Sequence, residues 1–234
     1  IESVGTGIAR IDYSSGEAAL LVEPQRTNLS LYSNQFNNSY WTKRAGLTIT
    51  DDFSISPDGT NNSSKCNLTS GDGYLFRTFN FNPSTTYTIS VFAKIAGSFQ
   101  FNIFSGSNSF VNTVNTSNEF QRFSFTFTTG ATTSAGDFGI KVFNNLEIFG
   151  FQLEIGNSIS SYIPTLASAI TRNQDLISKT GISDLINSQE GVLFLEMAAL
   201  SNNLTFREIS VNNGTNANKI VLRYNNTSNR IEAR

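Results

Sequence analysis

The sequence predicts an all-β protein: an antiparallel β-sandwich followed by an incomplete second β-sandwich. Three observations lead to this fold class. Apolar and polar residues alternate with a period of two in several segments, as they do on the two faces of a strand. Clusters of Gly, Asn, Ser and Pro separate these segments at the spacing of antiparallel sandwich strands. The 234 residues are 12% aromatic, with 20 Phe, and only 15% charged, which suits half-buried strands with uncharged outer faces.

The alternation of residues 121–128 is the clearest strand signal. Its odd-numbered side chains from 123 to 127 are all Phe, whereas the even-numbered ones are Ser or Thr. The same alternation predicts strands at 87–93, 99–103 and 138–142. Residues 146–153 are almost continuously apolar, which is typical of a central strand buried on both sides. We interpret the Phe faces as core, because one face of each sheet in a sandwich must be apolar.

The order of the alternating segments predicts two units. Alternation resumes after Gly191, in too few segments for the roughly seven strands of a complete sandwich. These segments are about 192–199, 204–211, 218–224 and 229–234. Between the units, residues 174–188 fit a turn or a short helix. We therefore expect a connecting segment at 1–18, a first sandwich at 19–172, a linker at 173–190 and the start of a second sandwich at 191–234, within a longer polypeptide.

Composition excludes several classes of function. The chain has no His, which removes Ser-His-Asp and Cys-His catalytic systems and His-ligated zinc. Its one cysteine, Cys66, can form neither an intramolecular disulfide nor a Cys-rich metal site. A formal net charge of -2 provides no basic surface for nucleic acid, and no apolar stretch is long enough to span a bilayer. We therefore expect no nucleic-acid partner and no membrane insertion.

The acidic residues of the expected strands argue against glycoside hydrolysis. That reaction needs two carboxylates about 5 to 10 Å apart. Glu147 and Glu154 are seven residues apart in one expected strand, which would place them on opposite faces of the sheet. The sequence therefore predicts no catalytic residue, and a protein that is not an enzyme.

Three aspartates are candidates for a structural calcium site. Asp51, Asp52 and Asp58 could offer carboxylate oxygens to Ca²⁺. Their spacing matches no defined calcium-binding loop, and adjacent acidic residues at a turn are more often simply solvated. Both interpretations stay open, and we expect no other cofactor.

An ordered series of motifs resembles a module common in bacteriophage tail, fibre and other virion-surface proteins. The module opens with ALLVEPQRTNL at 19–29, SNQF at 33–36 and Trp41-Thr42, and closes with FGFQLEIG at 149–156, SYIPT at 161–165 and Thr171-Arg172. Between them lie SPDGT at 56–60, KCNL at 65–68 and YTISVFAK at 87–94. The order of these motifs, over about residues 9–175, is more specific than any one of them. Beyond it, EGVLFLE at 190–196 and KIVLRY at 219–224 are similar to the first strands of a concanavalin-like lectin or laminin-G-type domain.

The resemblance implies a jelly-roll domain in residues 19–172, like the carbohydrate-binding modules found beside glycoside hydrolases. It implies a structural, non-catalytic protein on the virion surface, a tail or head fibre component that binds host cell-surface glycans. Other virion proteins and further copies of the same chain are its expected partners, with a homotrimer favoured. Two alternatives stay open: an accessory carbohydrate-binding region of a secreted polysaccharide-degrading enzyme, and a packing spacer that binds no sugar.

Tyr40, Trp41, Tyr74 and Arg77 are the candidate carbohydrate-binding residues. Aromatic faces stack on the apolar side of a sugar ring, and neighbouring polar groups bind its hydroxyls. The resemblance places Trp41-Thr42 at the start of a strand, which implies that core packing is the favoured interpretation of the Trp41 side chain. Tyr74 follows the Gly-rich residues 71–73, and both packing and ligand contact stay open for it.

Glu23, Arg26 and Glu154 form the candidate structural set. Arg26 lies in the opening motif, where charge is otherwise scarce. Its five fixed donors could bind backbone carbonyls, or pair with a carboxylate such as Glu154 of the closing motif. Such a clamp would tie the first motif of the module to the last.

Overall fold

The computed structural model describes residues 8–13, 16–94, 97–132, 134–187, 189–199, 201, 206–215, 217–227 and 230–234. The chain divides into two compact units, Ile1–Ile177 and Ser178–Arg234. The division falls within the segment 173–190, for which the sequence predicts a linker. Each unit has its own sheets.

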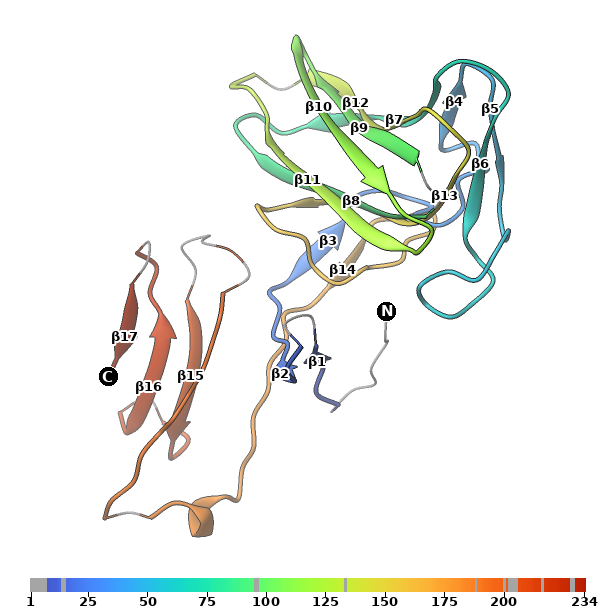
Figure 1. Cartoon of the computed structure of the whole chain (residues 1–234). Coiled ribbons are helices and arrows are strands. Elements are labelled where there is room, and N and C mark those ends of the chain that lie inside the picture. The colour runs from blue at the N-terminus through green and yellow to red at the C-terminus, as the bar shows by residue number, and fades with distance from the viewer. Residues whose placement is uncertain are drawn as a thin grey trace. The chain divides into compact units, whose positions relative to one another are not determined.

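The first unit is a sandwich of two five-stranded antiparallel sheets (Figure 1). One sheet, here called the open sheet, has the strand order β10-β9-β12-β7-β4. Its strands are β4 (Thr42–Arg44), β7 (Gly73–Phe81), β9 (Gly97–Ser105), β10 (Asn108–Thr116) and β12 (Ser134–Val142). The other, here called the covered sheet, has the order β11-β8-β13-β6-β5 and consists of β5 (Leu47–Thr50), β6 (Ser64–Leu68), β8 (Thr86–Lys94), β11 (Gln121–Thr128) and β13 (Leu146–Ile155). The predicted all-β, antiparallel sandwich is confirmed.

Side chains from the two sheets meet in an aromatic core. Phe99 and Phe101 of β9 are fully buried. They contact Phe123 and Phe125 of β11, with ring centroids 5.8 Å and 6.4 Å apart. Each such pair contributes about 0.5–1.5 kcal/mol beyond the area that it buries. The Phe face of β11 is therefore core, as the alternation of residues 121–128 predicts.

The outer face of the covered sheet is buried under the chain segment 160–165. On β8 and β13, Ser90, Gln152 and Glu154 point away from the core, yet their exposed fractions are 0%. The backbone N–H of Ser160 donates to Glu154 Oε1 at 2.9 Å, and that of Ile163 donates to Gln152 Oε1 at 2.8 Å. These polar side chains therefore serve the fold, and β13 is buried on both sides, as predicted.

A β-bulge in β13 corrects the expected positions of Glu147 and Glu154. Glu147 pairs with Lys94 and Glu154 pairs with Thr88, and these two partners lie on one face of β8. The register shifts near Gly150, whose φ is 65°, and one extra residue there reverses the alternation beyond it. The expectation of opposite faces is therefore wrong. Both carboxylates face outward, about 20 Å apart along the strand, which is too far for a glycosidase pair.

Two short ribbons complete the first unit. β1 (Ile11–Asp12) pairs with β2 (Ala19–Leu20), and β3 (Arg26–Asn28) pairs with β14 (Ile170–Arg172). The side-chain amide of Asn28, the last residue of β3, donates to the carbonyls of Phe151 and Ile163, at 3.1 Å and 2.8 Å. These bonds join the opening motif of the module to its closing motifs.

The second unit holds one three-stranded antiparallel sheet of β15 (Arg207–Asn212), β16 (Lys219–Tyr224) and β17 (Ile231–Ala233). The described residues 192–199 form no strand, although one was expected there. Their printed bond to the sheet is a side-chain one, from the Tyr224 hydroxyl of β16 to the Met197 carbonyl at 3.0 Å. In residues 174–187 only a 3₁₀ turn forms, η1 (Ser183–Leu185). Within the described part of the chain, no helix has the length and apolar character needed to cross a membrane.

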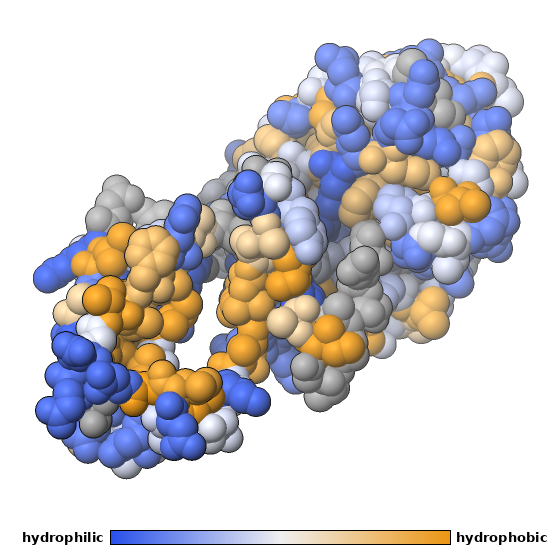
Figure 2. Space-filling view, turned by 60° about the horizontal axis from the view of Figure 1, so that its bottom comes forward, coloured by the Kyte–Doolittle hydropathy of each residue, from blue (hydrophilic) through white to orange (hydrophobic). Residues whose placement is uncertain are grey.

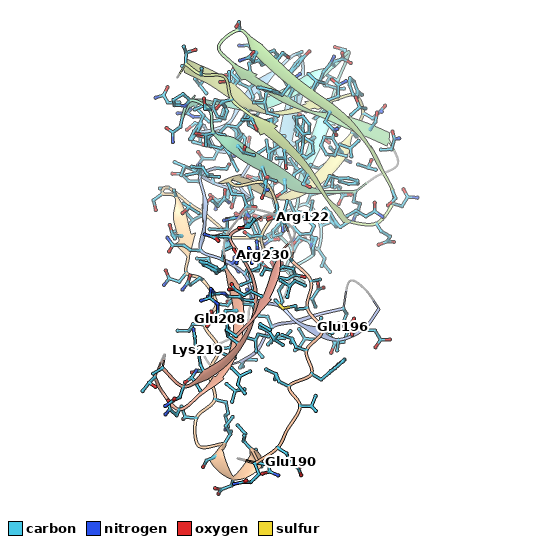
Figure 3. The ribbon with its side chains drawn as sticks, turned by 90° about the vertical axis from the view of Figure 1, so that its left-hand side faces the viewer. Arg122, Glu190, Glu196, Glu208, Lys219 and Arg230 are labelled. Carbon is cyan, nitrogen blue, oxygen red and sulfur yellow. The ribbon has the colours of Figure 1, made fainter. Side chains whose placement is uncertain are left out.

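The sheet of the second unit has one polar and one apolar face. Glu208 and Lys219 form an ion pair of 3.1 Å on the polar face (Figure 3). Ile220 and Ile231 lie exposed on the other, and Figure 2 shows apolar residues gathered on this unit. A sandwich needs a second sheet over such a face, and the described residues of this unit provide none. That residues 191–234 begin a second sandwich stays a prediction.

Candidate functional site

The outer face of the open sheet is partly exposed and carries aromatic and charged side chains. In the strand register, Tyr74 of β7 lies between Arg44 of β4 and Lys141 of β12. In the next row, Phe76 lies opposite Gly139. Because residues two apart in a strand share a face, all five positions lie on the side of the sheet away from the core. The outer face of the covered sheet lies under the segment 160–165. Among the described residues, no such segment is hydrogen-bonded across the outer face of the open sheet.

A hollow of ≈ 360 Å³ lies on this face. Its lining residues are Arg44, Ala45, Tyr74, Phe76, Asn102, Phe104, Asp137 and Ile140. Gly139 pairs with Phe76 on one side and Asn102 on the other. A Cβ at Gly139 would lie 2.6 Å from the Cα of Phe76, so no side chain fits there and the face stays hollowed at its centre. The volume is at the lower end of the roughly 300–1,000 Å³ typical of small-ligand sites.

Polar groups accompany the rings that line the hollow. Asp137 Oδ1 accepts a hydrogen bond from Thr78 Oγ1 at 2.8 Å. Asn102 Oδ1 is buried and has no hydrogen-bond partner among the described residues. Lys141 Nζ lies 2.7 Å from Asp72 Oδ2, and this hydrogen bond raises the pKa of Lys141. The hollow thus combines ring faces, acceptors and cations.

Trp41 lies in the core and not on this face. Its side chain is 1% exposed. Its ring contacts those of Phe151 and Phe36, at centroid distances of 5.0 Å and 5.5 Å. The indole N–H donates to the backbone carbonyl of Tyr32 at 3.1 Å, so the polar end of the ring is also satisfied inside the protein. Packing accounts for every part of this side chain.

Of the other candidate ligand residues, only Tyr74 lines the hollow. Arg77 is three residues from Tyr74 on β7 and therefore occupies the opposite face of that strand. Its guanidinium stacks on the Tyr40 ring, 4.6 Å from the centroid, and donates to the Tyr40 carbonyl at 3.1 Å. Tyr40 and Arg77 thus bind each other beside Trp41.

Sequence reasoning missed most residues of the hollow. Arg44, Phe76, Asn102, Phe104 and Asp137 come from four strands, and no sequence pattern joins them. One signal was available: a glycine at 139, inside an apolar strand, often marks a point where another group approaches the backbone closely.

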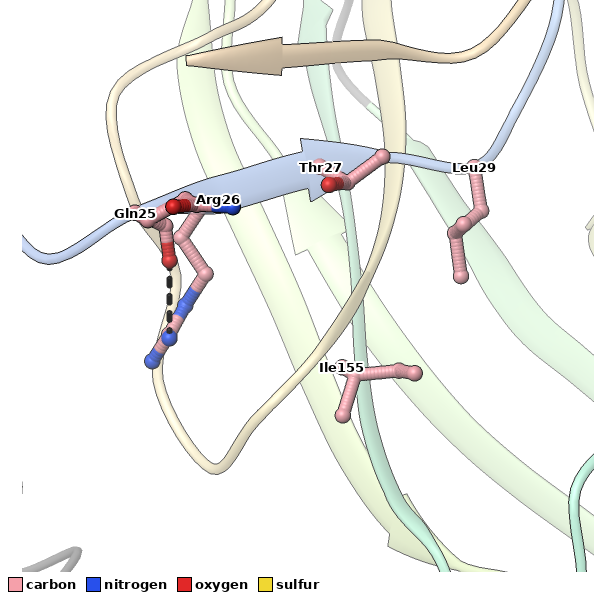
Figure 4. Close-up of a pocket in the computed structure, with 5 residues that line it drawn as sticks. All are labelled: Gln25, Arg26, Thr27, Leu29 and Ile155. Carbon is pink, nitrogen blue, oxygen red and sulfur yellow. Dashed lines mark hydrogen bonds between the residues drawn. The ribbon is translucent and has the colours of Figure 1, made fainter. Parts of the chain in front are cut away.

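Arg26 and Glu154 lie together at the junction of the opening and closing motifs. Arg26 Nε is 3.6 Å from Glu154 Oε2, and Arg26 also donates to the Gln25 carbonyl at 3.4 Å (Figure 4). A Cβ at Gly156 would lie 2.8 Å from Arg26 Nη2, so a glycine is needed for the guanidinium to lie there. A second hollow, of ≈ 270 Å³, is lined by Gln25, Arg26, Thr27, Leu29 and Ile155.

Glu23 is the centre of a separate network of ion pairs. Its carboxylate accepts from the guanidinium groups of Arg10, at 2.5 Å, and Arg172, and from the backbone N–H of Ser161 at 2.7 Å. Arg10 also pairs with Asp175, whose Oδ2 accepts from the Glu23 N–H at 2.8 Å. The network ties the N-terminal ribbon to the end of the first unit.

Replacing Arg26 with alanine is expected to lower the melting temperature and leave ligand binding at the open sheet unchanged. Glu154 would lose its nearby cation but keep the donors of Ser160, so the free energy of unfolding should fall by about 1–3 kcal/mol. Thermal unfolding measures this, with exposed Gln25→Ala as the neighbouring control. A wild-type melting curve for Arg26→Ala would show that Arg26 is not a clamp.

The calcium candidates lie in two places, Asp51 and Asp52 directly after β5 and Asp58 in the turn at 56–60. Asp51 Oδ1 accepts from Ser64 Oγ at 2.5 Å, and Asp58 Oδ1 accepts from the backbone N–H of Thr60 at 2.8 Å. Asp52 has a φ of 56° at the turn that follows β5. In the described ranges, no group of three or more Asp, Glu, His or Cys side chains is arranged to hold a metal ion.

Comparison with known proteins identifies structures with a similar fold. No protein family and no curated protein matches this sequence. The enzymatically active domain of tailspike protein 4 of bacteriophage CBA120 is 14% identical, with a TM-score of 0.47 over 56% of this chain and 21% of that chain. The CBM22-1 xylan-binding domain of Paenibacillus barcinonensis Xyn10C is 11% identical, with a TM-score of 0.42 over 57% and 94%. TmCBM61, in complex with β-1,4-galactotriose, is 13% identical, with a TM-score of 0.43 over 54% and 97%.

These likenesses concern the β-sandwich alone. The chain spans 21% of the tailspike chain and 30% of a Clostridium thermocellum xylanase 10B chain that carries CBM22-1 and GH10 modules. All these TM-scores lie below 0.5, so no ligand or activity is transferred from these proteins. The site of this chain rests on its own geometry.

Proposed function

We propose that the first unit is a non-catalytic glycan-binding domain whose ligand lies on the outer face of the open sheet. The observation that carries this proposal is the hollow of ≈ 360 Å³ bordered by Tyr74, Phe76 and Phe104. The ring of Phe104, which is 44% exposed beside the hollow, is suited to the apolar side of a sugar ring. Asn102 and Asp137 supply acceptors for its hydroxyls, and the buried, unpartnered Oδ1 of Asn102 would gain a donor.

We further propose that this domain belongs to a structural protein of the phage virion surface, a tail or head fibre component that attaches to host cell-surface glycans. The support is the ordered series of motifs over about residues 9–175. Other virion proteins are the expected partners, and a homotrimer is the favoured assembly, because virion appendages are usually symmetric oligomers. The mass of the intact protein in solution tests the assembly, and a stable monomer would count against it.

Alanine at Tyr74 or Phe104 is expected to weaken glycan binding about tenfold, because each change removes a ring that borders the hollow. A glycan array identifies ligands for the wild-type chain, and calorimetry with the best ligand measures each affinity. Phe53→Ala is the matched control, since Phe53 is 43% exposed and Phe104 44% exposed, and Phe53 does not line the hollow. Its affinity should equal that of the wild type.

Two outcomes would contradict the proposal. Unchanged affinity in a Tyr74→Ala, Phe104→Ala double variant would show that the ligand lies elsewhere. An absence of binding to every glycan on the array, and to envelopes of candidate host cells, would leave the packing-spacer interpretation.

A further inference from the structure

We infer that the glycan recognised by the open sheet is acidic, with carboxylates on its sugar rings, and that Arg44 is the residue that binds the carboxylate. The inference rests on the proposed function of the same face and names the chemical class of its ligand. Three features in and beside the hollow support it. Arg44 has no counter-ion in the described part of the chain, Arg44 and Lys141 flank the ring of Tyr74, and Asn102 and Asp137 offer hydrogen-bond acceptors.

Arg44 presents unused donors at the edge of the hollow. Its side chain is exposed, and its guanidinium carbon lies 4.8 Å above the centroid of the Phe76 ring. In the described ranges, no carboxylate forms an ion pair with it. A stacked guanidinium uses its flat face for the ring, which leaves the N–H groups in its plane free to bind a carboxylate with two parallel hydrogen bonds.

Lys141 adds a second cation on the other side of Tyr74. The register places Arg44 and Lys141 one strand away from Tyr74 on either side, and therefore about 10 Å apart. The carboxylate of Asp72 balances the charge of Lys141, with 2.7 Å between Oδ2 and Nζ. The Asp72 side chain is itself 48% exposed, just before β7. An anionic group above the Tyr74 ring would be attracted by both cations, whereas a neutral sugar would leave Arg44 without a counter-charge.

The acceptors at the other side of the hollow show that the ligand also donates hydrogen bonds. Asp137 lines the hollow, and its carboxylate would repel a ligand that is anionic throughout. The unpartnered Asn102 Oδ1 likewise needs a donor. A sugar chain with hydroxyls beside Asp137 and a carboxylate beside Arg44 gives hydrogen-bond partners to both residues. A neutral glycan has no carboxylate for Arg44, and a polyanion without hydroxyl groups has no donor for Asp137.

Binding of acidic polysaccharides and their carboxyl-reduced forms tests the inference. We expect the wild-type chain to bind at least one of sodium polygalacturonate, sodium alginate and polysialic acid, and to bind its carboxyl-reduced form at least about tenfold more weakly. Arg44→Gln should weaken binding of the acidic form about tenfold and leave the reduced form unchanged. Lys65→Gln removes a cation from the outer face of the covered sheet and should bind as the wild type does.

The outcomes separate this inference from the proposed function. Equal binding of the acidic and reduced forms, binding of neutral glycans only, or wild-type binding of the acidic form by Arg44→Gln would overturn the inference and leave a glycan-binding domain. Binding of no glycan, acidic or neutral, would overturn both. A loss of acidic binding in Lys65→Gln equal to that in Arg44→Gln would overturn the inference by showing attraction to net charge alone.

Discussion

Replacing Trp41 with alanine is expected to lower the free energy of unfolding by about 3–5 kcal/mol. The indole is buried among Phe36, Phe138 and Phe151, with T-shaped contacts to the last two at 6.0 Å and 5.0 Å. Phe138 lies on β12 and Phe151 on β13, and each of these strands is paired on both sides, which limits how far they can move into the cavity that truncation leaves. Thermal unfolding should show a melting temperature lower by roughly 10 °C.

A conservative variant separates packing from ligand binding. Trp41→Phe keeps an aromatic ring in the core and should retain the glycan affinity of the wild type, because Trp41 does not line the hollow. The exposed Phe53→Ala serves as the control for stability and should change the free energy of unfolding by less than about 1 kcal/mol. A Trp41→Phe protein that melts normally but has lost glycan binding would show that the indole contacts the ligand.

Replacing Glu23 with glutamine is expected to lower the free energy of unfolding by about 3 kcal/mol, the lower end of the cost of breaking a buried ion pair. The carboxylate is 3% exposed and lies between the guanidinium groups of Arg10 and Arg172. A neutral amide would leave these two cations close together with only Asp175 as counter-ion. Urea unfolding at pH 7 measures the effect. Glu119→Gln, at an exposed position of the same unit, should stay within about 0.5 kcal/mol of the wild type.

The contribution of Glu23 should also depend on pH. Burial raises the pKa of Glu23, but hydrogen bonds from Ser161 and Arg10 and the charge of Arg172 together lower it below its ordinary value. The unfolded chain therefore takes up the proton first as the pH falls. The stabilisation is complete above the ordinary value, about 4.3, and is lost as the pH falls through the lower folded value. The difference between wild type and Glu23→Gln should shrink below about pH 4, and an equal difference at pH 7 and pH 3 would contradict this account.

Local patterns were sufficient for five strands of the sandwich, β8, β9, β11, β12 and β13, and for the apolar face of β11. On β11, Phe127 is buried in the core, and Phe123 and Phe125 are partly buried against it. Residues 146–153 lie in β13, buried on both sides. Alternation is a property of a single strand, because its side chains point to opposite faces in turn, so it can be recognised without knowing the neighbouring strands. The pattern at 192–199 shows the limit, since these described residues alternate but form no strand.

Alternation could not predict on which face a side chain lies beyond a β-bulge, because the extra residue of the bulge reverses the alternation. The bulge near Gly150 brings Glu147 and Glu154 to one face, although seven residues separate them. A glycine at that point is compatible with either a regular strand or a bulge. The choice is made by hydrogen bonds to β8, which lies more than fifty residues earlier in the chain.

The amino-acid sequence by itself predicted that this chain forms antiparallel sheets and that the Phe faces of its strands enter the core, and its lack of histidine removed Ser-His-Asp and Cys-His catalysis. Only the tertiary structure decided which sheet keeps an accessible outer face, and that Arg44, Tyr74 and Lys141 stand in one row across it. The physical reason is that a strand's own alternation is local, whereas the register between strands distant in sequence is set by hydrogen bonding and packing across the whole sandwich.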